Sequence, residues 1–323
     1  MRAAVAVAQS MENPLSGLSI TDIPQPEDRP GWTRIHVRAA SLNPHDVWTL
    51  RGVGHPADRL PMVLGCDGAG VTEAGDEVVI HPVLGDPNRG GGDVTLDPQR
   101  ALLTETVNGA LAEYVLVPDA CVVPKPAWLS FHEAATLGIV WGTAYRMLFT
   151  RAGLRPGDRV LVQGASGGVG SAAITLARAA GARVYATARS EAKRDFALGA
   201  GAHEAFESGA RLPERVDIVV DTVGEATWAH SLRSLRPGGT IVTCGATSGQ
   251  LPPAELNRIF FQQLSVIGST ASTRAEFESL LSFLGASGVR PHLDSVLPFD
   301  EVHAGFQRLI DGDVRGKLVI EGA

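Results

Sequence analysis

A glycine-rich loop between a predicted strand and a predicted helix constrains this chain more than any other feature. The loop is Gly164–Gly170 (GASGGVG); the Val-rich run Arg159–Gln163 precedes it, and the small residues of Ser171–Ala180 predict a helix. In a unit of about 30 residues, this order is typical of dinucleotide-binding folds. The start of such a helix presents free N–H groups and a positive dipole end to a diphosphate. A tight turn that binds no ligand is the alternative.

Two glycines of this loop have predicted tasks. Gly167 has no Cβ, so the backbone can approach a pyrophosphate closely, and Gly170 lets the helix lie tight on the strand. The first glycine of the usual G-x-G-x-x-G pattern falls on Ala165, with Gly164 just before it. The residues expected to contact the cofactor here are Ala165, Ser166, Gly167, Gly168, Val169 and Gly170.

The end of the next predicted strand, Arg183–Thr187, indicates which dinucleotide is bound. A site for NAD(H) usually has Asp or Glu at this point, whereas this chain has Ala188. Arg189 offers a guanidinium fork suited to the 2′-phosphate of NADP(H), with Ser190 beside it and Lys193 one helical turn further. These residues favour NADP(H) as the cofactor. The alternative is that Arg189 and Lys193 are solvated surface residues.

The pattern of the chain changes near residue 140. Before that point, short β-type runs separated by Pro and Gly predict a compact, mostly β region. Beyond it, apolar strands alternate with helices such as Ser190–Leu198, which predicts a parallel sheet with helices on its faces. The predicted strands are Thr33–Arg38, Val78–His81, Ala112–Val117, Arg159–Gln163, Arg183–Thr187, Asp217–Asp221, Thr240–Thr243 and Leu264–Ile267.

Three further elements are predicted after Gly268, and one long loop before residue 140. Apolar residues at helical spacing predict a helix over Arg274–Leu284, and a second helix, Glu301–Asp311, precedes a closing strand, Lys317–Ile320. The polar segment Gly85–Pro98 has no periodicity and is expected to be a loop.

Composition excludes several classes of function. The chain has 323 residues, and 28 Lys and Arg face 35 Asp and Glu, so its net charge is −7. Such a surface repels phosphate backbones and anionic lipid, which excludes nucleic-acid and membrane-surface roles. No stretch reaches the about 20 apolar residues that span a bilayer, and no signal-peptide core is visible. We expect a cytoplasmic protein that acts on a small molecule.

The chain resembles the medium-chain dehydrogenase/reductase superfamily, and within it the zinc-lacking quinone-oxidoreductase and enoyl-reductase branches. The resemblance rests on ordered motifs along nearly the whole chain: Ser41–Val47 (SLNPHDV), Gly65–Gly70 (GCDGAG), Ala112–Val115, Pro124–Pro126, Glu133–Ala135, Thr143–Arg146, Gly164–Gly170 and Gly316–Val319. It implies an α/β fold: a Rossmann doubly wound parallel sheet, residues 141–267, inserted in a mostly β GroES-like catalytic domain, residues 1–140 and 268–323.

In this superfamily a catalytic zinc is held by Cys, His and Cys, with Glu beside the His. The corresponding positions here are Asn43, Cys66 and Ile139, with Asp67 beside Cys66. One soft ligand cannot make the tetrahedral site that zinc prefers, so no metal is expected. The alternative is that Cys66 and Asp67 bind a metal with His45. The structural zinc lobe is also missing, since residues 83–110 contain no cysteine.

Without a Lewis acid, the resemblance implies an NADPH-dependent oxidoreductase that transfers hydride to a quinone or an α,β-unsaturated carbonyl. Such acceptors are already electrophilic and need mostly proximity and polarisation of their carbonyl oxygen. Asn43 is the predicted donor to that oxygen or to the nicotinamide ribose. Asp46 could orient Asn43 or His45, and His45 could relay a proton. A loop-capping Asn43, a plain turn at Asp46 and a surface His45 are the alternatives.

Further cofactor contacts are expected outside the loop. Thr143 lies where the family's threonine meets the nicotinamide, and Gly245 and Ile267 end predicted strands, where open α/β sheets bind ligands. Lys317 is a weaker candidate for the same cofactor. A homodimer is expected through the strand edge at Ser265–Ile267. Two other functions remain open: an alcohol or aldehyde dehydrogenase of the same superfamily, and a non-catalytic NADPH-binding protein.

Overall fold

The computed structural model describes residues 1–322, which form two compact units. The first unit comprises Met1–Ile139, Thr273–Leu281 and the chain from Leu293 onward. The second comprises Val140–Ser272 and Ser282–His292. Each unit has its own sheet and its own buried core. No helix among residues 1–322 combines the length and the apolar character needed to cross a bilayer.

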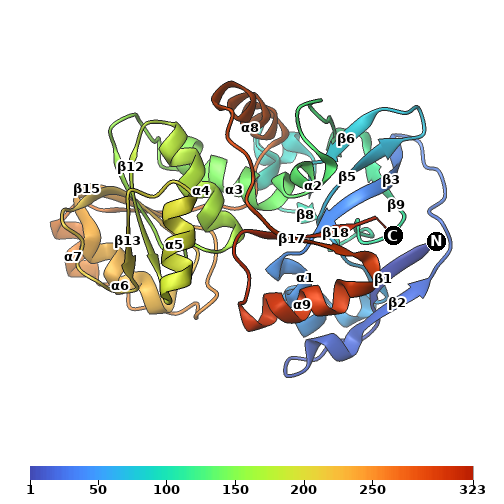
Figure 1. Ribbon diagram of the computed structural model, residues 1–323, viewed down its shortest axis with the longest axis horizontal. Coiled ribbons are helices and arrows are strands. Elements are labelled where there is room, and N and C mark those ends of the chain that lie inside the picture. The colour runs from blue at the N-terminus through green and yellow to red at the C-terminus, as the bar shows by residue number, and fades with distance from the viewer. Residues whose placement is uncertain (323) are drawn as a thin grey trace. The chain divides into compact units, whose positions relative to one another are not determined.

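The second unit is built on a six-stranded parallel sheet in the order β13-β12-β11-β14-β15-β16 (Figure 1). Helix α4 (Gly168–Ala179) packs on β11 and β12, α5 (Glu191–Gly199) on β12 and β13, and α6 (Glu225–Ser234) on β14 and β15. The strands are β11 (Arg159–Val162), β12 (Arg183–Ala188), β13 (Glu204–Glu207), β14 (Val216–Asp221), β15 (Leu235–Thr243) and β16 (Ser265–Gly268). The predicted parallel sheet is confirmed.

Two strands of this sheet differ from the sequence prediction. Strand β13, with the sequence EAFE, was missed because two apolar residues between glutamates are too short an apolar run to indicate an edge strand. Strand β15 begins at Leu235 and not at Thr240, because Leu235 already pairs with Val216 of β14; an irregularity that includes Gly238, with φ +73°, separates this pair from the regular ladder that begins at Thr240. The central strands were predictable, since strands covered on both faces are continuous apolar runs, and Val160, Leu161 and Val162 are fully buried.

The first unit contains a seven-stranded sheet in the order β10-β6-β5-β3-β18-β17, with β9 also paired to β3. A three-stranded sheet, β2-β1-β4, and a β7-β8 pair complete it. The strands are β1 (Arg2–Ala6), β2 (Leu18–Asp22), β3 (Trp32–Ser41), β4 (Met62–Val63), β5 (Asp67–Thr72), β6 (Glu77–Ile80), β7 (Val83–Leu84), β8 (Ala101–Leu102), β9 (Tyr114–Pro118), β10 (Val122–Pro124), β17 (Leu293–Pro298) and β18 (Lys317–Glu321). The expected mostly β architecture is confirmed.

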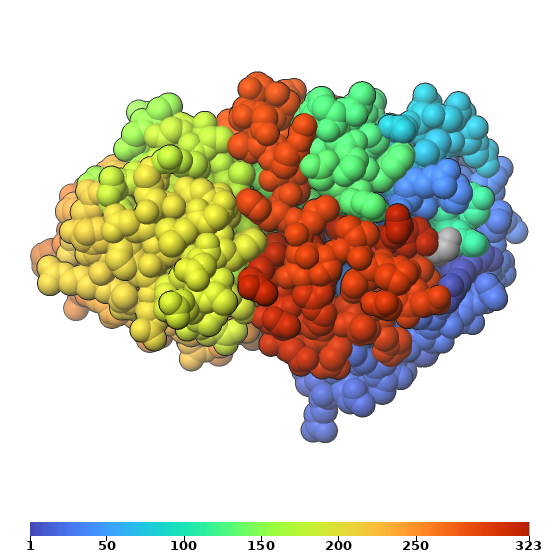
Figure 2. All heavy atoms as spheres, viewed as in Figure 1, coloured from blue at the N-terminus to red at the C-terminus, as the bar shows by residue number. Residues whose placement is uncertain are grey.

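Helices of the first unit include α1 (Pro44–Arg51) and α9 (Val302–Asp311), and α8 (Arg274–Ser287) has residues of both units. Helix α5 lies on the surface of the second unit and α9 on the surface of the first (Figure 2). Close strand packing explains Gly70, because a Cβ there would lie 2.1 Å from the carbonyl oxygen of His36.

The segment Gly85–Pro98 is a loop, as predicted, and one carboxylate organises it. Asp97 accepts hydrogen bonds from the side chain of Arg89 and from the backbone N–H groups of Asp86 and Gln99. These contacts hold the pKa of Asp97 well below its usual value, with the Arg89 hydrogen bond as the main cause. Hydrogen bonds to the carboxylate of Asp97 therefore order this loop, which has no periodic pattern of apolar residues.

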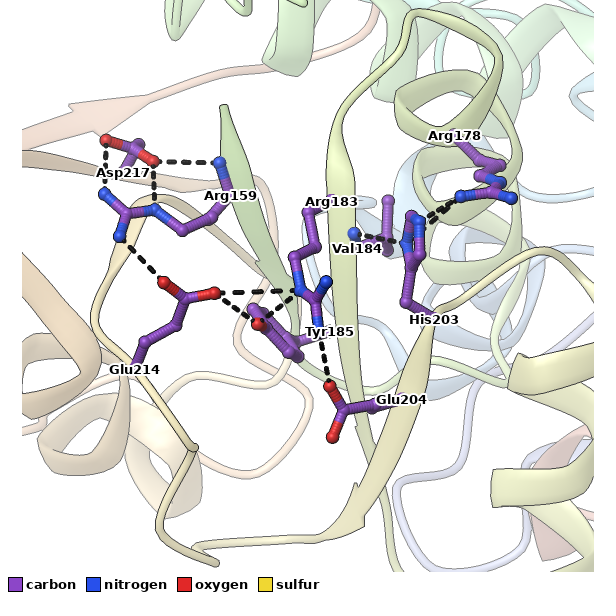
Figure 3. A network of polar contacts seen from close by, with 9 residues as sticks. All are labelled: Arg159, Arg178, Arg183, Val184, Tyr185, His203, Glu204, Glu214 and Asp217. Atoms are coloured by element: carbon purple, nitrogen blue, oxygen red, sulfur yellow. Dashed lines mark hydrogen bonds and ion pairs between the residues drawn. The ribbon is translucent and has the colours of Figure 1, made fainter. Parts of the chain in front are cut away.

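A network of ion pairs joins the amino ends of the parallel strands (Figure 3). Arg159, at the start of β11, lies 2.9 Å from Asp217 and 3.0 Å from Glu214, and Arg183, at the start of β12, lies 2.9 Å from Glu204. Open parallel sheets bind their ligands at the carboxyl ends of the strands. The network therefore stabilises the edge of the sheet that lies away from the expected ligand.

Candidate functional site

The glycine-rich loop of the second unit has the geometry of an anion-binding helix start. Helix α4 begins at Gly168, and Gly167 is its extended N-cap residue. Gly164 has φ +66°, a conformation that favours glycine. The first N–H groups of α4 have no partner within the helix, so they can bind an anion. The predicted order of strand, loop and helix is confirmed.

Two glycines of the loop differ in what the fold itself demands. A Cβ at Gly170 would lie 2.4 Å from the carbonyl oxygen of Gly164, so only glycine fits, as predicted. A Cβ at Gly167 would find its nearest atom, the same oxygen, at 3.6 Å, which is ordinary contact. The protein's own atoms do not require glycine at 167. A diphosphate bound close to the backbone at Gly167 would require it.

The other residues expected around the cofactor lie beside this loop. The N–H of Ala165 donates to the carbonyl oxygen of Thr187 at 3.2 Å, which joins the loop to β12. Arg189 follows the end of β12 and is exposed, and Ser190 caps α5. Lys193 lies in the first turn of α5. The guanidinium of Arg189 therefore lies just beyond β12, the strand to which the glycine loop is hydrogen-bonded.

A buried polar network that sequence analysis missed lies at the end of β11. Gln163, the residue before the loop, donates from its amide to Ser231 at 3.0 Å and to His230 at 2.8 Å. The hydroxyl of Ser231 donates in turn to Asp221 at 2.7 Å, and Thr187 donates to the amide oxygen of Gln163. These contacts join the carboxyl ends of β11, β12 and β14. Only the polar residue at the end of an apolar strand, Gln163, marks this network in the sequence.

Thr143, Gly245 and Ile267 also lie in the second unit. Thr143 is buried in α3 (Gly142–Tyr145), which contacts α4 and has π-helical turns on both sides. Gly245 follows β15, and a Cβ there would lie 2.9 Å from the carbonyl oxygen of Thr222. Ile267 lies near the end of the edge strand β16, paired with Val242. Gly245 and Ile267 thus lie at the carboxyl ends of β15 and β16, as expected.

In the first unit, Asn43 is the centre of a buried polar cluster. Its amide nitrogen donates to Asp67 at 2.9 Å and to the carbonyl oxygen of Ser41 at 3.2 Å. Its amide oxygen accepts a hydrogen bond from Lys317 at 2.6 Å. Asn43 is almost completely buried, and both of its amide hydrogens are engaged within the protein. In this arrangement Asn43 has no hydrogen left for a substrate carbonyl.

Lys317 lies in this cluster and not among the residues of the glycine loop. Its ammonium donates to the carbonyl oxygen of Leu42 at 2.8 Å and to Asn43, and it lies 3.5 Å from Asp67. An ammonium has three hydrogens, and these three oxygens surround it. The structure shows that Lys317 holds Asn43 and Asp67, and its contact with the cofactor stays a prediction.

Asp46 fixes the backbone around Asn43. Its carboxylate accepts from the N–H of Asn43 at 3.0 Å and from the N–H of Gly65 at 2.9 Å. Burial raises the pKa of Asp46, although the nearby His45 acts to lower it. The orienting role expected for Asp46 thus acts through the backbone of Asn43, at the start of α1.

His45 lies in the first turn of α1 beside a carboxylate. Its Nε2 is 3.8 Å from an oxygen of Glu105, and its side chain is 17% exposed. This distance is too long for a hydrogen bond but short enough for a protonated ring to be attracted to the carboxylate. Nε2 itself is buried and makes no hydrogen bond to any described residue, so the exposed part of the His45 side chain lies elsewhere on the ring.

The residues at the family's zinc position do not fit a zinc ion. Burial raises the pKa of the Cys66 thiol far above its usual value, and Asp46 and Asp67 act in the same direction. A bound zinc would itself deprotonate this thiol, so the misfit lies in the set of donors: Cys66 supplies a single sulfur, and the Lys317 ammonium, 3.5 Å from Asp67, would repel a cation. Ile139 contributes only its backbone N–H, which donates to Asp67 at 2.6 Å. Among residues 1–322, no three His, Cys, Asp or Glu side chains are grouped to hold a metal.

A parallel sheet with a glycine-rich loop and a separate, mostly β unit together define the architecture of a two-domain oxidoreductase. A family model described as an alcohol dehydrogenase GroES-like domain matches residues 29–127, and one described as a zinc-binding dehydrogenase matches residues 168–286. A crotonyl-CoA reductase of Streptomyces avermitilis is 32% identical over 90% of this chain and 78% of that protein. The chain belongs to the medium-chain dehydrogenase/reductase superfamily.

Two other similar proteins carry different functional names. A quinone oxidoreductase of Mus musculus is 30% identical over 93% of this chain and 92% of that protein. A crystal structure described as an NAD-dependent alcohol dehydrogenase has a TM-score of 0.93 and 36% identity, and covers 100% of both chains. The superfamily is therefore clear, whereas the names of these relatives point to different substrates.

Proposed function

We propose that this protein transfers hydride from NADPH to a quinone or an α,β-unsaturated carbonyl without a catalytic zinc. The observation that carries the proposal is the Lys317 ammonium, which lies against Asn43 and Asp67, two positions that the resemblance assigns to the superfamily's zinc site. In alcohol oxidation the hydroxyl must lose its proton, which needs either a metal ion that acts as a Lewis acid on the hydroxyl oxygen or a tuned base. Enones and quinones accept hydride without that step, so a site without a metal suits them better.

The choice of NADPH rests on the end of β12. Ala188 has no carboxylate to repel a 2′-phosphate, and the exposed Arg189 offers it a bidentate partner. The similar structure described as NAD-dependent argues for the other cofactor. Binding of NADPH and NADH to the same preparation distinguishes the two.

In this proposal the dinucleotide binds at the glycine-rich loop of the second unit, and the polar cluster around Asn43 lies in the first unit. Lys317, Asp67 and Asp46 hold Asn43 and the start of α1 in one arrangement. His45, beside Glu105, is the proposed source of the proton that completes the reduction. Asn43 is a positioning residue in this proposal, since its amide groups are engaged.

We also propose a homodimer formed through the free edge of β16. This strand ends the six-stranded sheet, and an unpaired edge can pair with a second copy. Large apolar side chains near it are exposed, which is typical of an interface. They are Leu251, Leu256, Phe260, Phe261 and Val266.

The test is a comparison of acceptors with purified protein. We expect NADPH oxidation with 1,4-naphthoquinone or 2-cyclohexen-1-one, and no NADP+ reduction with primary alcohols. Alcohol oxidation instead would identify an alcohol dehydrogenase, as the name of the similar structure suggests. Tight NADPH binding without turnover on a broad panel would indicate a non-catalytic cofactor-binding protein.

A further inference from the structure

Gln163 is a buried polar residue directly after an apolar strand. It follows Val162, the last residue of β11, and it is fully buried, as are the three apolar residues before it. Burying an amide destabilises the folded state unless its donors and its acceptor are paired. An apolar side chain would pack at this position without that requirement. An amide here therefore indicates a task for its hydrogen bonds.

The amide of Gln163 has one orientation that satisfies its neighbours on α6. Nε2 of His230 lies 2.8 Å from the carbonyl oxygen of Ala210, and a carbonyl only accepts, so Nε2 carries the hydrogen of the neutral ring. Nδ1 is then an acceptor, and it accepts from the amide nitrogen of Gln163 at 2.8 Å. Ser231 also accepts from that nitrogen, at 3.0 Å, because its own hydrogen is donated to Asp221. Both amide hydrogens of Gln163 are therefore directed to α6.

The imidazole of His230 is neutral at pH 7, as this arrangement requires. Burial lowers the pKa of His230 below its usual value, and the charge of Arg233 acts in the same direction. The hydrogen bond to Ala210 and the charge of Asp221 act to raise this pKa, but burial has the largest effect. A protonated ring would place an N–H at Nδ1 against the amide hydrogens of Gln163, so the network excludes it.

Thr187, on β12, is bonded to both residues that flank Gly164. Its hydroxyl donates to the amide oxygen of Gln163, and its carbonyl oxygen accepts from the N–H of Ala165 at 3.2 Å. The carbonyl oxygen of Gly164 accepts in turn from the N–H of Gly167 at 3.2 Å, directly before α4 begins. The contacts of Thr187 thus fix the first residues of the glycine-rich loop, and these residues hold the start of the helix.

The turn between β14 and α6 also contacts the glycine-rich loop. A Cβ at Gly164 would lie 2.8 Å from Cγ2 of Val223, so this turn packs directly on the loop. Asp221 fixes the turn, because its carboxylate accepts from the N–H groups of Val223 and Gly224 at 2.9 and 3.0 Å. The same carboxylate accepts from Ser231 at 2.7 Å. One network of buried hydrogen bonds therefore joins both segments that border the loop.

We infer that Gln163 positions the glycine-rich loop for the diphosphate of the cofactor. The inference rests on the proposed function, because it takes this loop as the place where the dinucleotide binds. Gln163 is fully buried and acts through the loop, so it is a positioning residue. Thr187 and His230 act through Gln163, since they determine which way its amide points. A loop held in one arrangement binds the diphosphate without first being ordered, which favours a high affinity.

The first test compares two variants of Thr187 by isothermal titration calorimetry. Thr187→Val removes the hydroxyl, whereas Thr187→Ser keeps it. We expect the Kd for NADPH to rise about 10-fold in Thr187→Val, because a buried acceptor loses its donor, and to stay within about twofold of the wild type in Thr187→Ser. The Kd for NADH should change by the same factors, since both cofactors contain the diphosphate.

The second test compares two variants of His230. His230→Leu removes the acceptor for the amide of Gln163, whereas His230→Asn places an amide oxygen near the position of Nδ1. Both variants lose the hydrogen bond to Ala210, so both should have a lower melting temperature. The affinity for NADPH should fall only in His230→Leu. A loss of stability alone does not produce this difference.

Thr175→Val is the control, because it also removes a buried hydroxyl from the second unit. Thr175 lies in α4 and donates to the carbonyl oxygens of Ser171 and Ala200 at 3.0 and 3.1 Å, outside the network of Gln163. The control variant should have a lower melting temperature and unchanged affinity for both cofactors. A rise of Kd in Thr175→Val as large as that in Thr187→Val would overturn the inference.

The outcomes separate this inference from the proposed function. Wild-type protein that binds NADPH, with unchanged Kd in Thr187→Val and His230→Leu, would overturn the role of Gln163 and leave the proposed function intact. Wild-type protein that binds neither NADPH nor NADH would overturn both. If Thr187→Val does not fold, the two variants of His230 decide, and equal affinities of these two variants contradict the inference.

Discussion

The ammonium of Lys317 lies 2.6 Å from the amide oxygen of Asn43, although the two residues are 274 positions apart in the chain. The contact joins the start of β18 to the residue that caps α1. It places a buried ammonium beside Asn43, one of the positions that the resemblance assigns to the superfamily's zinc ligands. Lys317 and Asp67 are both buried, so each compensates the charge of the other.

Replacing Lys317 by Met should destabilise the first unit strongly. The change leaves the Asp67 carboxylate buried without its cation, and breaking a buried pair typically costs about 3–5 kcal/mol. Urea unfolding measures the loss. Glu204→Gln, which removes one partner of the exposed Arg183–Glu204 pair, should cost at most about 1 kcal/mol. Equal effects of the two variants would contradict the buried-pair interpretation.

Gly167→Ala and Gly170→Ala should separate cofactor binding from folding. At 170 the new Cβ would lie 2.4 Å from a backbone oxygen, so the variant should lose stability. At 167 the atom nearest to the new Cβ would be 3.6 Å away, so the melting temperature should stay the same. The affinity for NADPH should fall about 10-fold or more. Isothermal titration calorimetry and thermal melting check both. Unchanged affinity in Gly167→Ala would place the diphosphate elsewhere.

Arg189→Ala should weaken NADPH binding and spare NADH. A charge-assisted hydrogen bond contributes about 1.5–3 kcal/mol, which corresponds to about 10- to 100-fold in Kd. The measurement is the ratio of NADPH to NADH affinity by fluorescence titration. Arg211→Ala, which changes another exposed arginine of the same unit, is the control. A proportional loss for both cofactors would show that Arg189 does not bind the 2′-phosphate.

Asp217 should make stability depend on pH in the acid range. Burial raises its pKa, but the hydrogen bonds from Arg159 and Arg236 outweigh this and bring the pKa to about 2. Because the folded-state pKa lies below the unfolded one, the contribution is complete above about pH 4 and is lost as pH falls toward 2. Asp217→Asn should lower the free energy of unfolding by about 1–2 kcal/mol at neutral pH. It should also reduce the dependence of that free energy on pH in the acid range. Urea unfolding between neutral pH and about pH 3 tests it; parallel pH curves for the two proteins would contradict it.

Phe261→Glu should dissociate the proposed dimer. Phe261 is 75% exposed on α7 (Leu256–Phe261), and a charge there would be buried in an interface at high cost. Analytical ultracentrifugation should give a dimer for the wild type and a monomer for the variant. A wild-type monomer at all concentrations would overturn the assignment of the β16 edge.

The features that could be predicted from the sequence are those that depend on contacts between residues close together in the chain. Gly170 and the start of α4 depend on contacts within a few residues, so the strand–loop–helix order was sufficient to predict them. The contact between Lys317 and Asn43 was not predictable, because no local pattern reveals a contact between residues so far apart in the chain. The network around Gln163 was not predicted, because the contacts of this residue with β12 and α6 arise only in the packed structure. Strand β13 was missed for a related reason, since its stability comes from pairing with β12.

The central claim is a nicotinamide-dependent reduction that needs no metal. The most direct measurement is NADPH oxidation with 1,4-naphthoquinone by protein dialysed against a strong chelator, with metal content determined on the same sample. The account predicts full activity at far less than one metal ion per chain. Activity that disappears on chelation and returns with added zinc would contradict it.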